Sequence, residues 1–250
     1  MTTRRRFFTA AGLIAALPGG SRLLAALAAK TTAESRQVYT RLGLRPIINA
    51  AGTYTHLGGS LMPPEVLEAM DDAARHYVPI RELTKATGER IAQLTGNEGA
   101  LVTTGAAGAI FVGTCACIAG DDPDKAKRLP FTDGMRNEVV TQKLHNYGWT
   151  RQCEAAGARM VEVEYKDQLE RAINGKTAMI YFLIADRHFG RFRDVPDAPG
   201  GKISLEECVA VAKATRVPLL VDAAAELPPP GNLSSLTKLG VDLVAFSGGK

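Results

Sequence analysis

The sequence lacks the short motifs that identify several common classes of binding site. It contains neither the G-x-x-x-x-G-K-[ST] loop of nucleoside triphosphatases nor the G-x-G-x-x-G fingerprint of dinucleotide-binding proteins. Its four cysteines show no C-x-x-C spacing, and Cys115 and Cys117 would point to different faces of the helix expected around them. The pattern therefore favours small apolar roles for Cys115, Cys117, Cys153 and Cys208, and no metal site is expected.

Beyond residue 28 the sequence has no excess of positive charge. The chain has a formal net charge of +4, and its first 28 residues contain four arginines and no acidic residue. Removing these four from the 30 lysines and arginines leaves 26, which equals the number of acidic residues. Nucleic-acid binding depends on an excess of basic residues, which the sequence beyond residue 28 lacks, so a nucleic-acid partner is not favoured.

Residues 1–28 resemble a twin-arginine export signal. They combine three consecutive arginines, starting at Arg4, with an aromatic pair and a Gly/Ala-rich stretch, and Ala26-Leu27-Ala28 is a small-x-small cleavage pattern. A membrane anchor or an amphipathic start is the alternative, but the apolar residues 7–17 are too few to span a bilayer. We therefore expect a signal peptide over residues 1–28, export to the periplasm and no stable membrane span.

The rest of the chain alternates short apolar runs with helical patterns. Strands are expected at residues 100–103, 138–142, 159–163, 177–184, 219–221 and 243–246. Helices are expected from Pro64, over residues 80–94, up to Ala119, through Cys153, near residues 167–173, and from Ser204, which forms a capping-box pattern with Glu207. Because 46% of the residues are apolar and strands alternate with helices, the fold class is α/β, with three layers around a mostly parallel sheet.

Two of these apolar runs end in polar residues that suit one cofactor. Asp222 follows the run 219–221, and Ser247, two glycines and Lys250 follow the run 243–246. Open α/β sheets bind ligands at the carboxyl ends of their strands. A lysine amine and a carboxylate are the pair that pyridoxal phosphate (PLP) enzymes use, because the lysine forms a Schiff base and the acid keeps the pyridine nitrogen protonated. An ordinary strand end and a turn with a solvated lysine are the alternative.

A second candidate site is the turn after residues 100–103. Thr104, Gly105, Ala106 and Ala107 are small, and a helix is expected to begin among them. Such a turn lets backbone N–H groups approach an anion at the positive end of a helix dipole. The same small residues would also allow close packing of the helix on the sheet, so both interpretations stay open at this point.

The amino-acid sequences of these motifs resemble those of the selenocysteine synthase group of fold-type I PLP enzymes. V-D-A-A-A-E-L-P-P-P, V-D-L-V-A-F-S-G-G-K and the earlier N-A-A-G-T-Y-T-H-L-G-G pattern carry the resemblance, which covers about residues 45–250. This group includes bacterial L-seryl-tRNA(Sec) selenium transferase and D-glucosaminate-6-phosphate ammonia-lyase. The resemblance implies a PLP-binding large domain with a dimeric active site, in which Lys250 holds the cofactor and Asp222 faces the pyridine nitrogen.

The resemblance also assigns further positions. It implies that Thr104, Gly105, Ala106, Ala107 and Ser247 bind the cofactor phosphate, and that His145 stacks on its ring, with Tyr147 and Trp149 as competing candidates. His56 either touches substrate or is structural. A cationic loop over residues 186–202 either binds an anionic substrate group or is a solvated surface.

The domains implied are a signal peptide (1–28), an N-terminal arm (29–60) and the large domain (61–250). Family members continue past the lysine into a C-terminal domain, so we expect that the chain is a fragment without that domain. The expected function is α,β-elimination or β-replacement on a small amino acid or amino sugar, by a homodimer or higher homo-oligomer. Selenium transfer on seryl-tRNA and a non-catalytic periplasmic α/β binding protein are the alternatives.

Overall fold

A computed structural model describes residues 38–146, 148–184, 203–227 and 229–250. The expected signal peptide, the whole cationic loop at residues 186–202 and Tyr147 lie outside these residues. The chain divides into two compact units, residues 1–52 and 53–250. Residues 53–60, which we assigned to the N-terminal arm, belong to the second unit, and this second unit carries the sheet and the candidate site.

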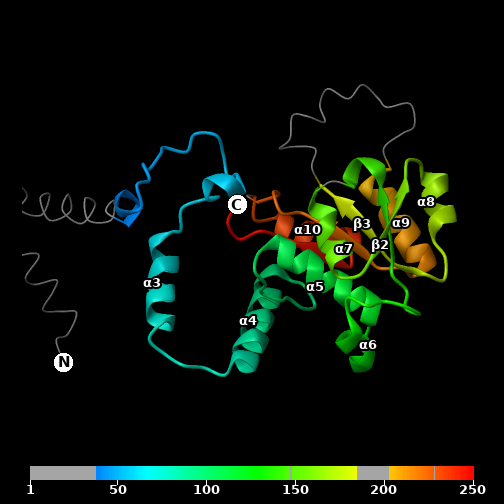
Figure 1. Ribbon diagram of the computed structural model, residues 1–250, viewed down its shortest axis with the longest axis horizontal. Helices are drawn as coiled ribbons and strands as arrows, with labels where there is room; N and C mark the ends of the chain where they lie inside the picture. The colour runs from blue at the N-terminus through cyan, green and yellow to red at the C-terminus, as the bar shows by residue number, and fades with distance from the viewer. Residues whose placement is uncertain (1–37, 147, 185–202, 228) are drawn as a thin grey trace, which may run out of the picture. The chain divides into compact units, whose positions relative to one another are not determined.

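The second unit is built on a five-stranded sheet in which every paired neighbour is parallel (Figure 1). Its strands are β1 (Glu138–Gln142), β2 (Arg159–Val163), β3 (Thr177–Leu183), β4 (Leu219–Asp222) and β5 (Leu243–Ala245), in the order β2-β1-β3-β4-β5. The positions and the parallel pairing agree with the prediction. The residues of β1 and β4 are all buried, as expected for strands covered on both faces.

Helices cover both faces of the sheet, which makes the three predicted layers. On one face, α5 (Ala106–Ala119) and α7 (Arg151–Ala155) contribute Ile110 and Cys153 to a core with Leu220 of β4. On the other face, α8 (Lys166–Ala172), α9 (Leu205–Thr215) and α10 (Asn232–Leu239) pack on the neighbouring positions Leu219 and Val221. Successive residues of β4 therefore alternate between the two layers, as a pleated strand requires.

Small residues allow α5 to lie close to the sheet. A Cβ atom added to Gly113 would be 2.7 Å from Cδ1 of Leu220, nearer than side chains normally approach.

The predicted capping box at the start of α9 is confirmed, because Ser204 Oγ accepts from the Glu207 N–H at 3.1 Å and Glu207 Oε2 accepts from the Ser204 N–H at 2.9 Å.

The remaining helices precede or connect these elements. They are η1 (Thr55–Leu57), α3 (Pro64–Ala73), α4 (Ile80–Thr95), α6 (Pro123–Arg128), η2 (Lys143–His145) and η3 (Gly148–Thr150). The segment after α4 is attached to α10, because Asn97 Oδ1 accepts from Thr237 Oγ1 at 2.6 Å. Within the described residues, no helix is both long and apolar enough to cross a membrane.

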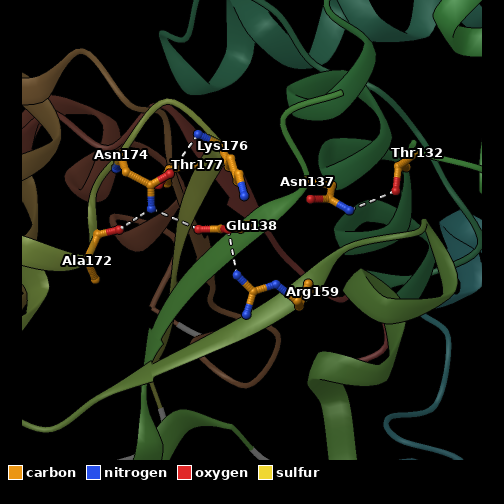
Figure 2. A network of polar contacts seen from close by, with 8 residues as sticks. All are labelled: Thr132, Asn137, Glu138, Arg159, Ala172, Asn174, Lys176 and Thr177. Carbon is orange, nitrogen blue, oxygen red and sulfur yellow. Dashed lines mark hydrogen bonds and ion pairs between the residues drawn. The ribbon is translucent and has the colours of Figure 1, made fainter. Parts of the chain in front are cut away.

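A polar network holds the amino edge of the sheet (Figure 2). The buried carboxylate of Glu138, at the start of β1, accepts from Asn174 Nδ2 at 2.9 Å and forms an ion pair with Arg159, at the start of β2. The hydrogen bond from Asn174 lowers the pKa of Glu138 most, and the contact with Arg159 lowers it further. This network lies at the opposite edge of the sheet from the candidate site. It connects the start of β1 to the start of β2 and to the residues that precede β3.

One predicted strand is wrong. Residues 100–103 have no strand conformation, and Leu101 and Val102 are more than half exposed. An isolated apolar run becomes a strand only when a neighbour offers backbone hydrogen bonds, and within the described residues β5 has no strand beyond it. Two short helices, α6 and α10, lie in segments for which the sequence predicts no element.

Candidate active site

The predicted acid and lysine lie at the same edge of the sheet. β4 and β5 pair in parallel, with Asp222 opposite Ala245. Asp222 is the last residue of β4, and residues 247–250 follow β5 as a turn in which the Lys250 N–H donates to the Ser247 carbonyl at 3.4 Å. Both motifs therefore lie beyond the carboxyl ends of neighbouring strands, where open α/β sheets bind ligands.

Asp222 is a buried carboxylate with defined hydrogen bonds. Its side chain accepts from the Tyr181 hydroxyl at 3.0 Å and from the Ala224 N–H at 3.0 Å, and the residue is only 3% exposed. Burial raises the pKa of Asp222, and the hydrogen bonds from Ala224 and Tyr181 offset part of that increase. The site therefore favours a positively charged partner beside this carboxylate, because such a partner would compensate for its lost hydration.

The amino end of α5 lies on the face of the sheet that Asp222 shares. Leu220, two residues before Asp222, packs against α5, and alternate residues of a strand share a face. The helix begins after Gly105, which has a positive φ of 85° and no side-chain cap. The first intrahelical bond is made by Ala109, so no described group accepts from the N–H groups of Ala106 and Ala107.

These predicted phosphate-binding residues differ in exposure. Thr104, Gly105 and Ala107 are exposed, whereas Ala106 is buried. A helix end with free N–H groups and no bulky side chains suits an anion. The two interpretations of the small residues are compatible, since Gly113 serves packing further along the same helix.

Lys250 is held by a segment nearly 200 positions away in the sequence. Its Nζ donates to the Thr53 carbonyl at 2.7 Å and to Thr55 Oγ1 at 2.9 Å. The Ser60 N–H donates to the Gly249 carbonyl at 2.9 Å. In Figure 1 the chain's C-terminal end accordingly lies beside η1, which contains Thr55.

The other predicted positions follow the carboxyl ends of β5 or β1, or lie in η1. Ser247 is half-buried. His145 ends η2 just after β1, and its ring meets Phe182 edge-on with centroids 4.5 Å apart, while Nδ1 accepts from the Leu183 N–H at 3.3 Å. Trp149, a competing candidate for the ring-stacking role, is 45% exposed. His56 is exposed in η1.

A pocket of about 180 Å³ opens beyond the carboxyl ends of β3 and β4, and none of the predicted site residues lines it. Its lining residues are Ile184, Glu226, Asn232, Ser235 and Leu236. In the part of the chain that the structure describes, no three His, Cys, Asp or Glu side chains are grouped to hold a metal ion.

Comparison with known proteins gives two relatives at 33% identity or more. The chain is 36% identical to D-glucosaminate-6-phosphate ammonia lyase of Salmonella typhimurium, over 85% of this chain and 57% of that protein. It is 33% identical to a 5'-C-glycyluridine monooxygenase-decarboxylase of a Streptomyces species, over 88% of this chain and 55% of that protein. A solved D-glucosaminate-6-phosphate ammonia-lyase superposes with a TM-score of 0.75 at 35% identity, covering 84% of this chain and 56% of that one. The chain belongs to the selenocysteine synthase-like group of fold-type I PLP enzymes.

More distant members of the group are also similar to the chain. An L-seryl-tRNA(Sec) selenium transferase of Desulfotalea psychrophila is 27% identical over 83% of this chain and 46% of that protein. The chain thus spans about half the length of the curated relatives it matches. No family model matches the sequence.

PLP is the cofactor of this family, and the residues present fit it. The buried carboxylate of Asp222 suits a protonated ring nitrogen, the amine of Lys250 suits an aldehyde, and the free N–H groups at the start of α5 suit a phosphate. Asp222 and Lys250 follow the carboxyl ends of β4 and β5, and α5 packs on the face of the sheet that Asp222 shares. The described residues therefore include a group suited to each of three parts of PLP: the ring nitrogen, the aldehyde and the phosphate.

Sequence reasoning missed two residues that contact this pair. Tyr181 belongs to the expected strand T-A-M-I-Y-F-L, in which it is the one hydroxyl-bearing aromatic residue and lies two residues before the strand's end. Its position near the carboxyl edge was the signal that could have identified it. Thr55 carried no such signal, since its contact with Lys250 joins residues 195 positions apart.

Proposed function

We propose that the protein is a PLP-dependent enzyme that eliminates or replaces a β-substituent of a small amino acid or amino sugar. The observation that carries the proposal is the parallel pairing of β4 with β5, which brings Asp222 and the turn bearing Lys250 to one edge of the sheet. Similarity to an ammonia lyase over 85% of the chain supports it.

Each residue of the site has a defined part in this proposal. PLP, when bound, supplies a ring that withdraws electrons from the substrate's α-carbon. Asp222 holds positive charge at the ring nitrogen, and Tyr181 and the Ala224 N–H keep its carboxylate oriented. The amine of Lys250, when free, accepts the substrate's α-proton.

The phosphate would be bound by backbone rather than by cationic side chains. The N–H groups of Ala106 and Ala107 offer two hydrogen bonds at the positive end of α5, and the hydroxyls of Thr104 and Ser247 can add to them. Ring stacking by His145 remains part of the proposal, supported by its position after β1.

A small substrate is favoured over seryl-tRNA. The ammonia lyase and the glycyluridine enzyme are 36% and 33% identical to the chain, against 27% for the selenium transferase of Desulfotalea psychrophila. Beyond residue 28 the chain is also electrically neutral, and tRNA binding depends on basic residues that neutralise phosphates.

The test is release of ammonia and a 2-oxo acid. The PLP-treated protein is incubated with amino acids and amino sugar acids that carry a β-leaving group, and Lys250→Ala serves as the inactive control. Product from any of these substrates, absent with Lys250→Ala, supports the proposal. Tight, salt-dependent association with seryl-tRNA(Sec) would favour selenium transfer instead. PLP binding with no elimination and, when a thiol nucleophile is added, no replacement of the β-substituent would favour a non-catalytic binding protein.

We also propose that the chain forms a homo-oligomer. The apolar side chains Val66, Leu67 and Met70 lie on α3, and each is 44–54% exposed. A second copy would remove such side chains from water. Sedimentation equilibrium tests this, and a monomer at micromolar concentration would contradict it.

Export in folded form is a further proposal, and it depends on the three arginines that begin at Arg4. Residues 1–28 are fused to a reporter that folds before export, and cell fractions are assayed. Replacing Arg4, Arg5 and Arg6 by lysine should keep the charge and yet leave the reporter in the cytoplasm. Equal periplasmic activity of the two fusions would contradict twin-arginine export.

A further inference from the structure

The amine of Lys250 is held by a segment that the proposed chemistry does not use. Nζ donates to two acceptors, the Thr53 carbonyl at 2.7 Å and Thr55 Oγ1 at 2.9 Å. The first acceptor is backbone and the second is a side chain, so only the second can be removed by a substitution. Both acceptors belong to the same compact unit as Lys250.

A close backbone approach fixes this segment against the lysine turn. The Ser60 N–H donates to the Gly249 carbonyl at 2.9 Å. Gly59 has a φ of +74°, and a Cβ atom added to it would be 2.4 Å from the same carbonyl oxygen. Any side chain at residue 59 would therefore push the segment and the turn apart.

The two hydrogen bonds are compatible with only one chemical form of the lysine. A protonated amine has three N–H groups and can donate to both acceptors. When an amine condenses with an aldehyde, two of these hydrogens leave with the aldehyde oxygen as water, and at most one N–H remains. The pair of contacts therefore belongs to the free amine.

We infer that Thr55 is a positioning residue that holds the free amine of Lys250. The inference rests on the proposed function, because it assigns the holding contact to the stage at which the lysine is not attached to the cofactor. Thr55 stabilises this detached form of Lys250. When a substrate amine takes the place of the Lys250 amine on the cofactor, the released Lys250 amine donates to Thr55. Removing its hydroxyl should make the amine more reactive and should shift the protein toward cofactor attachment.

The first experiment measures the reactivity of the amine without any cofactor. The cofactor-free protein is treated with an amine-acylating reagent, and the rate at Lys250 is followed by peptide mass spectrometry, with the other lysines as internal references. Thr55→Val should raise the rate at Lys250 about three- to ten-fold, the factor that corresponds to one lost hydrogen bond. Thr55→Ser keeps the hydroxyl and should match the wild type.

Thr53→Val is the matched control. It makes the same change two residues away, but it leaves the Thr53 carbonyl that accepts from Lys250 in place. The rate at Lys250 should therefore stay at the wild-type value. Equal rates for Thr55→Val and the wild type, or an equal increase with Thr53→Val, would overturn the inference.

A second pair of variants tests the backbone approach. Gly58 and Gly59 both have positive φ, so alanine strains both, but nothing lies within 4 Å of a Cβ atom at residue 58. Gly59→Ala should therefore raise the acylation rate at Lys250 more than Gly58→Ala does. Equal effects would mean that the segment's contact with Gly249 does not control the amine.

Cofactor attachment separates this inference from the proposed function. Borohydride trapping measures the concentration of PLP needed to label Lys250, and Thr55→Val should need about three- to ten-fold less PLP than the wild type. If the wild type takes up no PLP at all, the proposed function fails, while the acylation rates still decide the role of Thr55.

Discussion

The hydroxyl of Tyr181 donates a 3.0 Å hydrogen bond to Oδ2 of Asp222, and the two residues are 1% and 3% exposed. They lie on neighbouring strands, where Leu183 of β3 is opposite Asp222. Tyr181 is thus a diagonal neighbour on the same face of the sheet. Burial and the adjacent Asp222 both raise the pKa of Tyr181, so its hydroxyl stays protonated as a donor.

Replacing Tyr181 by phenylalanine should destabilise the protein in a pH-dependent way. The change removes a donor from a buried carboxylate, which costs about 1–3 kcal/mol where Asp222 is ionised and less where it is protonated. Urea unfolding at a series of pH values measures this. The loss relative to wild type should grow as the pH rises, and Tyr77→Phe, at a fully exposed ring, should show no such trend. A pH-independent loss would contradict the role assigned to the hydroxyl.

Asp222 itself should make the cofactor-free protein less stable as the pH rises. Its pKa is raised in the folded state, so between the unfolded-state and folded-state pKa values the unfolded chain binds fewer protons. The contribution of Asp222 is therefore fully present below the unfolded-state pKa and is lost as the pH rises through the folded-state pKa. Asp222→Asn lacks this titration.

The measurement is the difference in unfolding free energy between the wild type and Asp222→Asn, from about pH 4 to pH 8. The wild type should lose stability relative to the variant as the pH rises. Parallel curves over this range would show that Asp222 is not perturbed by burial.

Glu138 should behave in the opposite sense. The hydrogen bond from Asn174 and the contact with Arg159 lower its pKa in the folded state (Figure 2). Its contribution is present above the unfolded-state pKa and is lost as the pH falls through the folded-state pKa. Glu138→Gln should therefore reduce stability at neutral pH and converge with the wild type in acid. Glu164→Gln is the control, because the ion pair of Glu164 with Lys143 is exposed, and it should change little.

Much of the fold was predictable because periodicity and turn chemistry are local. The runs that form β3 and β4 are mostly apolar and continuous, as is typical of parallel strands covered on both faces. The missing strand at residues 100–103 has the same local signal, and only the absence of a described neighbour strand distinguishes it. Whether an apolar run pairs depends on distant residues, which local pattern does not contain.

The site was predictable to the same extent. Asp222 and Lys250 follow buried runs, and the parallel order of β4 and β5 brings them to one edge. Tyr181 and Thr55 depend on contacts across the fold, between residues 41 and 195 positions apart. Pairings over such separations follow from the assembled sheet and not from any short stretch of sequence.

The proposed function depends above all on the attachment of PLP to Lys250. The purified protein is mixed with PLP, reduced with borohydride and digested, and the labelled peptide is identified by mass. One label is expected, on Lys250, that is abolished by Lys250→Ala and kept by Lys238→Ala, a matched change at an exposed lysine. A label on another lysine, or undiminished labelling of Lys250→Ala, would contradict it.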